Sequence, residues 1–391
     1  MEKTCFAAFL KKYTIIIALV LVVVFFDITT EGKILSPQNI YSLISQNAYV
    51  FVLAMGMLFC ILIGGNIDLS VGAVACFTGA VGAMMMDRGV NVWAAVFLML
   101  VIGMLIGMWH GFWIAYRKVP SFFVTLAGMY IFRGLSDMLQ QGMTVSLKSE
   151  TFIKVFGGGA ECYVPDFFGG EDFNMTCMIT GGIAVIILVG VQLKNRINNK
   201  SRGDETASLG NAVIKLAGIS AVILWVAYQL AAHKGIPMAL IWILLVLLIY
   251  SYLIKKTGIG RYLYAAGGNE RAAGLADSNM KKMLFAAYAN MGFLAALAGI
   301  LTIARLATVQ PANGQGYEID AITACVVGGV SAHGGSGTVF GMVMGAILIG
   351  VINLGMNLMN IDTNRQMVVK GAVLLAAVVF EILNNKDKTK E

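Results

Sequence analysis

The chain has 391 residues, of which 58% are hydrophobic and 13% charged, and its mean hydropathy is +0.80. A soluble protein of this length needs a polar exterior, so the composition excludes a soluble globular protein. The formal net charge of +7 lies in short loops between apolar runs, where basic residues set membrane topology, so we expect no nucleic-acid partner. The sequence therefore predicts an all-α polytopic integral membrane protein whose exterior is solvated by membrane lipid.

Apolar runs that could cross a bilayer recur along the whole chain. The first, residues 13–26, is followed by Asp27 rather than by a small-residue cleavage site, so we expect a retained helix and not a signal peptide. The other runs are close to the roughly 20 residues that a transmembrane helix needs. They cover residues 48–64, 70–86, 92–115, 121–139, 176–193, 211–231, 238–254, 283–304, 338–358 and 366–383.

The charges of the loops alternate along the chain. Basic clusters lie at residues 117–118, 194–202 and 255–282, whereas the 140–175 loop carries five acidic residues against two lysines. Because basic loops stay in the cytoplasm, the 140–175 loop is predicted to be extracytoplasmic and the 255–282 loop cytoplasmic. Neither loop is long enough for a core of its own, so residues 1–391 are expected to form a single transmembrane domain.

The number of spans is limited by the position of the C-terminus. The runs above would leave it outside, yet the lysines at 386, 388 and 390 favour the cytoplasm. A further short span, broken or complete, must then lie near residues 321–330. We expect about 10–12 transmembrane helices, some of them broken or re-entrant.

Few residues offer chemistry for an enzyme. The three histidines are dispersed and no Gly-x-x-x-x-Gly-Lys-Ser/Thr loop exists, so the sequence predicts no catalytic residues, no metal and no cofactor. Cys162 and Cys177 flank the 140–175 loop. A disulfide between them is one alternative, but two unpaired thiols are favoured because nothing in their spacing demands a bridge.

Four ionisable residues lie at membrane depth or at its edge: Asp68, Glu318, Asp320 and Lys370. Charges there are costly, and they mark transport pathways by default. The favoured interpretation of the aspartates is nevertheless capping, Asp68 with Ser70 at a helix from Val71 and Asp320 at a helix from Ala321. Lys370 is expected to extend its amine toward the membrane surface.

Two glycine-containing segments, residues 64–72 and 328–337, echo each other between apolar spans. Paired interrupted helices of this kind line pathways in transporters. Coincidence is an equal alternative on pattern alone.

The predicted cytoplasmic loop has features of a docking element. Glycines punctuate both of its ends, Asn269 is a good N-cap for a short helix, and Ala272 and Ala273 give that helix a small apolar face. Such a helix suits a groove on a partner protein, although an ordinary solvated loop is an alternative that the pattern leaves open. The candidate docking residues are Gly258, Gly260, Arg261, Gly267, Gly268, Asn269, Ala272 and Ala273.

Five blocks of sequence carry a resemblance to a known family. They are residues 66–72 (NIDLSVG), 115–128 (AYRKVPSFFVTLAG), 264–273 (YAAGGNERAA), 318–329 (EIDAITACVVGG) and 369–372 (VKGA). In this order the chain resembles the permeases of the ribose, xylose and galactose class of ABC importers. Extra spans around residues 194–237 resemble the longer, xylose-type subgroup. One departure is Ala276-Asp277-Ser278, where the family usually has a Ser-Gly-Ile step, and it affects only the exit of the cytoplasmic loop.

The resemblance implies a function and a set of partners. It implies a non-catalytic permease in a bacterial cytoplasmic membrane that moves a monosaccharide, with xylose or a related pentose or hexose favoured. It further implies a separate ABC ATPase subunit at the 255–282 loop, an extracytoplasmic sugar-binding protein and a second permease copy, expected as a homodimer. We expect the pathway at the interface of the two copies, lined by Asn66, Asp68, Ser70, Glu318, Asp320 and Thr323.

Two other classes of function are weighed against this one. A secondary sugar transporter would need no ATPase and usually has a buried acid, base or ion site for coupling. A membrane-embedded enzyme would need a catalytic constellation, which the scattered acids and histidines do not supply.

Overall fold

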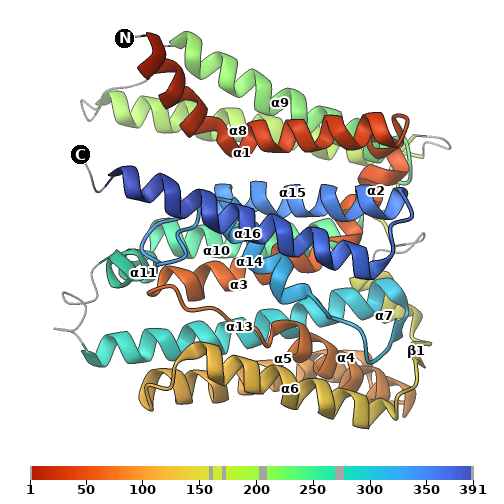
Figure 1. The fold of residues 1–391 in the computed structure, drawn as a ribbon. Coiled ribbons are helices and arrows are strands. Elements are labelled where there is room, and N and C mark those ends of the chain that lie inside the picture. The colour runs from red at the N-terminus through yellow and green to blue at the C-terminus, as the bar shows by residue number, and fades with distance from the viewer. Residues whose placement is uncertain (1, 158–161, 170–172, 202–208, 269–276, 389–391) are drawn as a thin grey trace.

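The computed structural model describes residues 2–157, 162–169, 173–201, 209–268 and 277–388. These residues form one helical bundle, and the only strands among them are β1 (Val145–Ser146) and β2 (Thr308–Val309), which pair antiparallel. The predicted all-α class is therefore confirmed (Figure 1).

The helices follow the predicted spans closely. In chain order they are α1 (Glu2–Thr29), α2 (Pro37–Gln46), α3 (Ala48–Leu62), α4 (Val71–Asp87), α5 (Val92–Gly111), α6 (Ser121–Gln140), α7 (Glu150–Phe156), α8 (Met175–Ser201), α9 (Leu209–Ala231), α10 (Met238–Lys256), α11 (Gly258–Gly268), α13 (Asp277–Leu306), α14 (Tyr317–Val327), α15 (Val339–Leu358) and α16 (Thr363–Lys388). A short 3₁₀ helix, η1 (Lys33–Leu35), precedes α2, and a π-helix, η2 (Phe112–Tyr116), extends α5.

Seven of the described helices are long and apolar enough to cross a membrane: α5 with η2, α6, α8, α9, α10, α13 and α15. An eighth span results if α2 and α3, which meet at a 42° bend, are one crossing. The apolar part of α1 (Thr14–Thr29) and α4 are shorter. The chain is thus a multi-pass membrane protein, while the total of 10–12 crossings stays a prediction.

The centre of the bundle is built on close backbone contact. In the most apolar 18-residue stretch of α13, 67% of the residues are buried, and in that of α15 78% are buried. Gly103 and Gly107 of α5 face Gly292 of α13, and a Cβ added to any of the three would overlap backbone atoms of the other helix. Small residues four apart let membrane helices approach in this way, because no side chain separates the two backbones.

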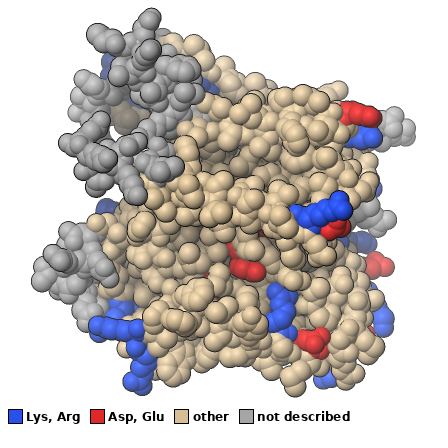
Figure 2. Space-filling model, viewed as in Figure 1, with Lys and Arg blue, Asp and Glu red and all other residues tan. Residues whose placement is uncertain are grey.

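The periphery is built differently. In the corresponding stretches of α8 and α9, only 11% of the residues are buried. Side chains such as Ile186 and Ile214 are more than two thirds exposed. Figure 2 shows a mostly uncharged face on which most of the charged side chains lie toward one of its two ends. Exposed apolar side chains in such a band are suited to lipid rather than to water.

The two predicted loops lie at opposite ends of the bundle (Figure 1). Helix α10 connects them: near its start Trp242 donates to the carbonyl of Val155 in α7, and its end leads into α11. We call these the β1 end, which carries β1 and α7, and the α11 end. Which end faces the cytoplasm is a prediction from charge alone.

Candidate functional site

The first interruption separates α3 from α4. Residues 63–70 are not helical, and Gly64 and Gly65 both have φ of +73°, a conformation that glycine adopts without strain. The phenol of Tyr288 in α13 donates to the carbonyl of Ile67 at 3.3 Å. Irregular backbone is tolerated inside a membrane protein only where neighbouring groups satisfy it, as α13 does here.

The predicted cap at this interruption is partly wrong. Helix α4 begins at Val71 as expected, but the Ser70 side chain makes no capping bond. Instead Asp68 Oδ1 accepts from the Ser70 backbone N–H at 2.8 Å and from the Ser70 hydroxyl at 2.6 Å. Both side chains are buried. The carboxylate therefore fixes the turn before the helix and does not bind the helix amides, because a local turn already uses its oxygen.

The second interruption separates α13 from α14. Residues 310–316 form turns, and Arg133 of α6 holds them by donating to the carbonyl of Asn313 at 2.7 Å. Helix α14 follows Gly316, whose φ is +79°. Its 11 residues span about 16 Å, roughly half of a bilayer core. The predicted short span near residues 321–330 is thus a half-length helix that begins earlier, at Tyr317.

The two interruptions meet inside the bundle. Gly72, in the first turn of α4, packs backbone to backbone against Gly314, because a Cβ on either would overlap the carbonyl of the other. The carboxylate of Glu318 lies beside Gly72, and its Oε2 has no hydrogen-bond partner among the described residues. Of the predicted pathway residues, Glu318 and the Asp68–Ser70 turn are therefore brought to the same region. Thr323 lies one turn into α14, buried, with its hydroxyl donating to Ile319 at 2.7 Å.

The two similar glycine-containing segments, residues 64–72 and 328–337, contact each other, but at a different place from the meeting of the two interruptions. A Cβ on Gly65 would overlap the carbonyl of Ala332, and Gly334 lies against the backbone of Gly64. The segments 63–66 and 331–337 therefore pack together near the α11 end. The segment that meets the start of α4, however, is 310–316, on the other side of α14.

Asp320 is part of a buried ion pair and not a cap. It lies in the first turn of α14, where Gly316 is the N-cap. Its Oδ2 accepts from Lys370 Nζ of α16 at 2.8 Å and from the Tyr49 phenol of α3 at 2.6 Å. The Lys370 side chain is 17% exposed. The expectation that Lys370 reaches the surface is thus wrong, because a carboxylate inside the bundle neutralises it at lower cost.

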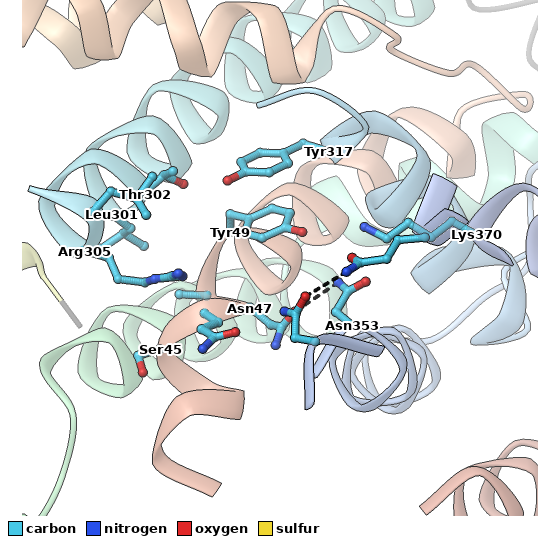
Figure 3. Close-up of a pocket in the computed structure, with 14 residues that line it drawn as sticks. Ser45, Asn47, Tyr49, Leu301, Thr302, Arg305, Tyr317, Asn353 and Lys370 are labelled. Atoms are coloured by element: carbon cyan, nitrogen blue, oxygen red, sulfur yellow. Dashed lines mark hydrogen bonds between the residues drawn. The ribbon is translucent and has the colours of Figure 1, made fainter. Parts of the chain in front are cut away.

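A polar cavity of about 180 Å³ lies beside this ion pair, where α13 and α15 end and α16 begins. Its carboxamide groups come from Gln46, Asn47, Asn353, Asn357 and Gln366. Its hydroxyl groups come from Ser45 and Thr302, its aromatic rings from Tyr49 and Tyr317, and its charged groups from Arg305 and Lys370. Figure 3 shows the tyrosine rings between Arg305 and Lys370. The rings stack with centroids 3.6 Å apart.

Sequence reasoning missed most of this cavity. Arg305 escaped notice because the predicted span ended at residue 304, one residue before it. Asn47 and Asn353 are neutral, so the criterion of ionisable residues at membrane depth does not select them. A search for any polar side chain inside an apolar run would have found Asn353, which lies in the last third of α15 and is buried.

The predicted docking residues lie partly in α11. Gly260 is buried against α10, Gly267 packs against Leu62 and Gly335, and Arg261 is exposed. Gly258 and Gly268 are exposed as well. Asn269, Ala272 and Ala273 lie outside the described residues. The Tyr264 phenol donates to the carbonyl of Gly337 at 2.7 Å, and burial raises the pKa of that phenol.

A second, larger cavity of about 550 Å³ lies at the α11 end. Asn66, Gly267 and His333 line it together with Lys118 and the start of α13. The predicted pathway residue Asn66 and the predicted docking element α11 therefore share one cavity.

Neither Cys162 nor Cys177 is in a disulfide. Cys162 donates to the carbonyl of Ile153 at 3.1 Å and Cys177 to that of Ala227 at 3.3 Å. The favoured alternative, in which the two cysteines form no bridge with each other, is what the structure contains.

A multi-pass bundle with two interrupted helices that meet at its centre, and with polar cavities toward both ends, is the architecture of a membrane transport protein. Comparison with known proteins gives the family. Residues 39–378 match the family described as "Branched-chain amino acid transport system / permease component", and the chain belongs to it. It is a transport subunit and not an enzyme.

Individual relatives are similar over nearly their whole length. The xylose transport system permease protein XylH of Haemophilus influenzae is 38% identical over 386 residues, 96% of this chain and 97% of the relative. XylH of Escherichia coli K12 is 36% identical, over 94% of this chain and 91% of the relative. The ribose import permease protein RbsC of H. influenzae is 33% identical, over 88% and 85%. No solved structure matches the chain.

Proposed function

We propose that the chain is the transmembrane permease of an ABC importer that moves a monosaccharide, xylose or a related pentose or hexose, across a bacterial cytoplasmic membrane. The observation that carries this proposal is the 38% identity to a xylose permease over 96% of the chain. The polar lining of the cavity at the β1 end suits a cargo rich in hydroxyl groups.

The charges of the loops assign the two ends. The acidic 140–175 loop puts the β1 end outside, where a sugar-binding protein delivers the cargo, and the basic 255–282 loop puts the α11 end inside. The two cavities then lie toward the entry and the exit of the transport path. Weak contacts suit such a path, because strong binding inside the membrane would trap the sugar.

The path itself is proposed at the interface of two permease copies. Asn66 lines the inner cavity, and the Asp68–Ser70 turn and Glu318 lie where the two interruptions meet. With Asp320 and Thr323 of α14 they shape the region that must rearrange when the path opens. Interrupted helices suit this role because their ends are held by side chains and not by a continuous backbone ladder.

Coupling to ATP hydrolysis is proposed through the 255–282 loop. Helix α11 is anchored to the bundle, since Gly267 packs against the end of α3 and Tyr264 donates to Gly337. An ATPase domain that binds the loop would therefore move the end of α3 and the turn between α14 and α15 with it. Rigid-body rocking of packed helices is a common form of such a transition.

The test is a pull-down of the tagged protein from mild detergent. The double variant Ala272→Glu with Ala273→Glu places two charges on the apolar face of the predicted docking helix. It should lose a co-purifying ATPase and sugar uptake while inserting into the membrane normally. The control is Ala207→Glu with Ser208→Glu, which adds the same charge to another loop that is predicted to be cytoplasmic. Normal sugar uptake in the Ala272→Glu, Ala273→Glu variant would show that this loop is not where the ATPase docks.

The buried Asp320–Lys370 pair supports a second candidate function, a secondary transporter. A carboxylate and an amine inside a membrane are typical of proton-coupled transport. Uptake measured at fixed ATP separates the two candidates: a proton-conducting uncoupler would stop a secondary transporter and leave an ATP-driven importer running.

A further inference from the structure

We propose that the cavity at the β1 end is a binding site for one neutral monosaccharide within each permease copy. This inference rests on the sugar-importer function proposed above and adds to it a specific site that is separate from the predicted pathway residues. The evidence is the pattern of donors and acceptors that the lining residues leave unused.

The orientation of the carboxamides is fixed by a chain of hydrogen bonds. Asn47 Nδ2 donates to the carbonyl of Leu43 at 2.9 Å, so its Oδ1 is the atom that accepts from Asn353 Nδ2 at 3.1 Å. Asn353 Oδ1 is left without a partner among the described residues. Because Asn353 is 7% exposed, this buried acceptor requires a donor from whatever occupies the cavity.

Thr302 presents a second unused group. The residue is 9% exposed, and its hydroxyl lies beside the Tyr317 phenol without the geometry of a complete hydrogen bond to it. A hydroxyl both donates and accepts, so it pairs equally well with a hydroxyl of a ligand. Thr302 and Asn353 come from α13 and α15, so one ligand between them would connect two of the most buried helices of the bundle.

The unused acceptor of Asn353, more than the charges of the lining, favours a neutral ligand with hydroxyl groups over a simple anion. The positive charge of Lys370 is already balanced by Asp320 at 2.8 Å. Arg305 offers a planar set of N–H donors and has no ion pair with another described residue. A simple anion without hydroxyl groups would suit Arg305, but it could not donate to Asn353 Oδ1. A sugar hydroxyl can accept a hydrogen bond from the Arg305 guanidinium and donate one to Asn353 Oδ1.

The shape of the cavity also suits a single sugar ring. A volume of about 180 Å³ is well above the roughly 10–15 Å³ that one water requires, but below the roughly 300 Å³ of the smallest drug-sized pockets. Tyr49 and Tyr317 supply an aromatic wall for the C–H groups of the ring. Asn357 and Leu306 are exposed at the rim, so the cavity opens at the β1 end.

The test measures sugar binding by the full chain in lipid nanodiscs, without ATPase or binding protein. Isotopically labelled D-xylose is titrated and observed by NMR line broadening, which detects roughly millimolar affinity. Thr302→Val keeps the shape of the side chain and removes its hydroxyl. It should raise the Kd for xylose about tenfold, the usual effect of losing one hydrogen bond in a buried site. Thr302→Ser should restore binding.

A matched control is Thr125→Val in α6, a buried threonine far from this cavity in sequence whose hydroxyl bonds within its own helix. It should bind xylose like the unaltered chain. Equal Kd values for Thr302→Val and the unaltered chain would overturn the site. Stronger binding of xylonate than of xylose would overturn the neutral ligand.

Uptake by the complete importer in cells is measured alongside. Absence of xylose binding in nanodiscs, with normal uptake in cells, would remove the site and leave the importer function standing. Binding in nanodiscs without uptake of any sugar would support the site and count against the importer function.

Discussion

The α5–α13 contact and the α8–α9 pair are both made of apolar membrane helices, yet they are held in different ways. Glycines bring the α5 and α13 backbones together inside the protein, whereas α8 and α9 expose most of their apolar side chains. In a bilayer, apolar side chains gain little by leaving lipid for protein, so exact backbone fit and polar pairs must decide which contacts hold. The loss of stability caused by a substitution should therefore depend on backbone proximity and polar pairing, and not on hydrophobicity.

The largest effect is expected for Gly292→Leu. Its Cβ would overlap the backbone of Gly103 and Gly107, and backbone cannot move aside as a flexible side chain can. We expect a loss of at least about 3 kcal/mol and little folded protein, measured by fluorescence-detected size exclusion after heating. Gly190→Leu on α8, where an added Cβ meets nothing within 4 Å, is the matched control. Equal melting temperatures of the two variants would refute the comparison.

The next effect concerns the buried ion pair. Lys370→Met leaves the carboxylate of Asp320 buried without its cation, which typically costs about 3–5 kcal/mol. Adding Asp320→Asn should recover most of the stability, because no unbalanced charge remains. The exposed pair of Lys154 and Glu150 is the control, and Lys154→Met should cost no more than about 0.5 kcal/mol. If the double variant were no more stable than Lys370→Met, the pair would not be what stabilises this region.

The smallest effect is expected at the periphery. Cys177 joins α8 to α9 through a thiol that donates to the carbonyl of Ala227, and neither Cys177 nor Cys162 is in a disulfide. A reducing agent should therefore leave the melting temperature and the electrophoretic mobility unchanged. A mobility shift on reduction would show a bridge between these residues.

Apolar runs made most of the fold predictable. Helices α5, α6, α8, α9, α10, α13 and α15 lie where spans were expected, because a bilayer requires long uninterrupted helices. The start of α14 was placed four residues too late, since an aspartate was expected as its N-cap. The helix instead begins after Gly316, whose positive φ ends the preceding turn.

The candidate site was predictable only in part. Asp68, Glu318, Asp320 and Lys370 stood out as charges in apolar surroundings, but their partners did not. Asp320 and Lys370 are 50 positions apart, and Tyr49 is 271 positions from Asp320. Pairing over such distances in the chain depends on how the helices pack. The pattern of residues within a single sequence gives no signal for it.

Helix α14 has a mechanical consequence. Asp320 lies near its start, and the turn after it runs to Gly337, which accepts a hydrogen bond from Tyr264 of α11. An 11-residue helix is a stiff rod about 16 Å long. Asp320 lies about 10 Å along this rod from its α11 end, so pivoting the rod there by about 10° would move Asp320 by about 2 Å. A shift of this size directed away from α16 would break the 2.8 Å hydrogen bond between Asp320 and Lys370.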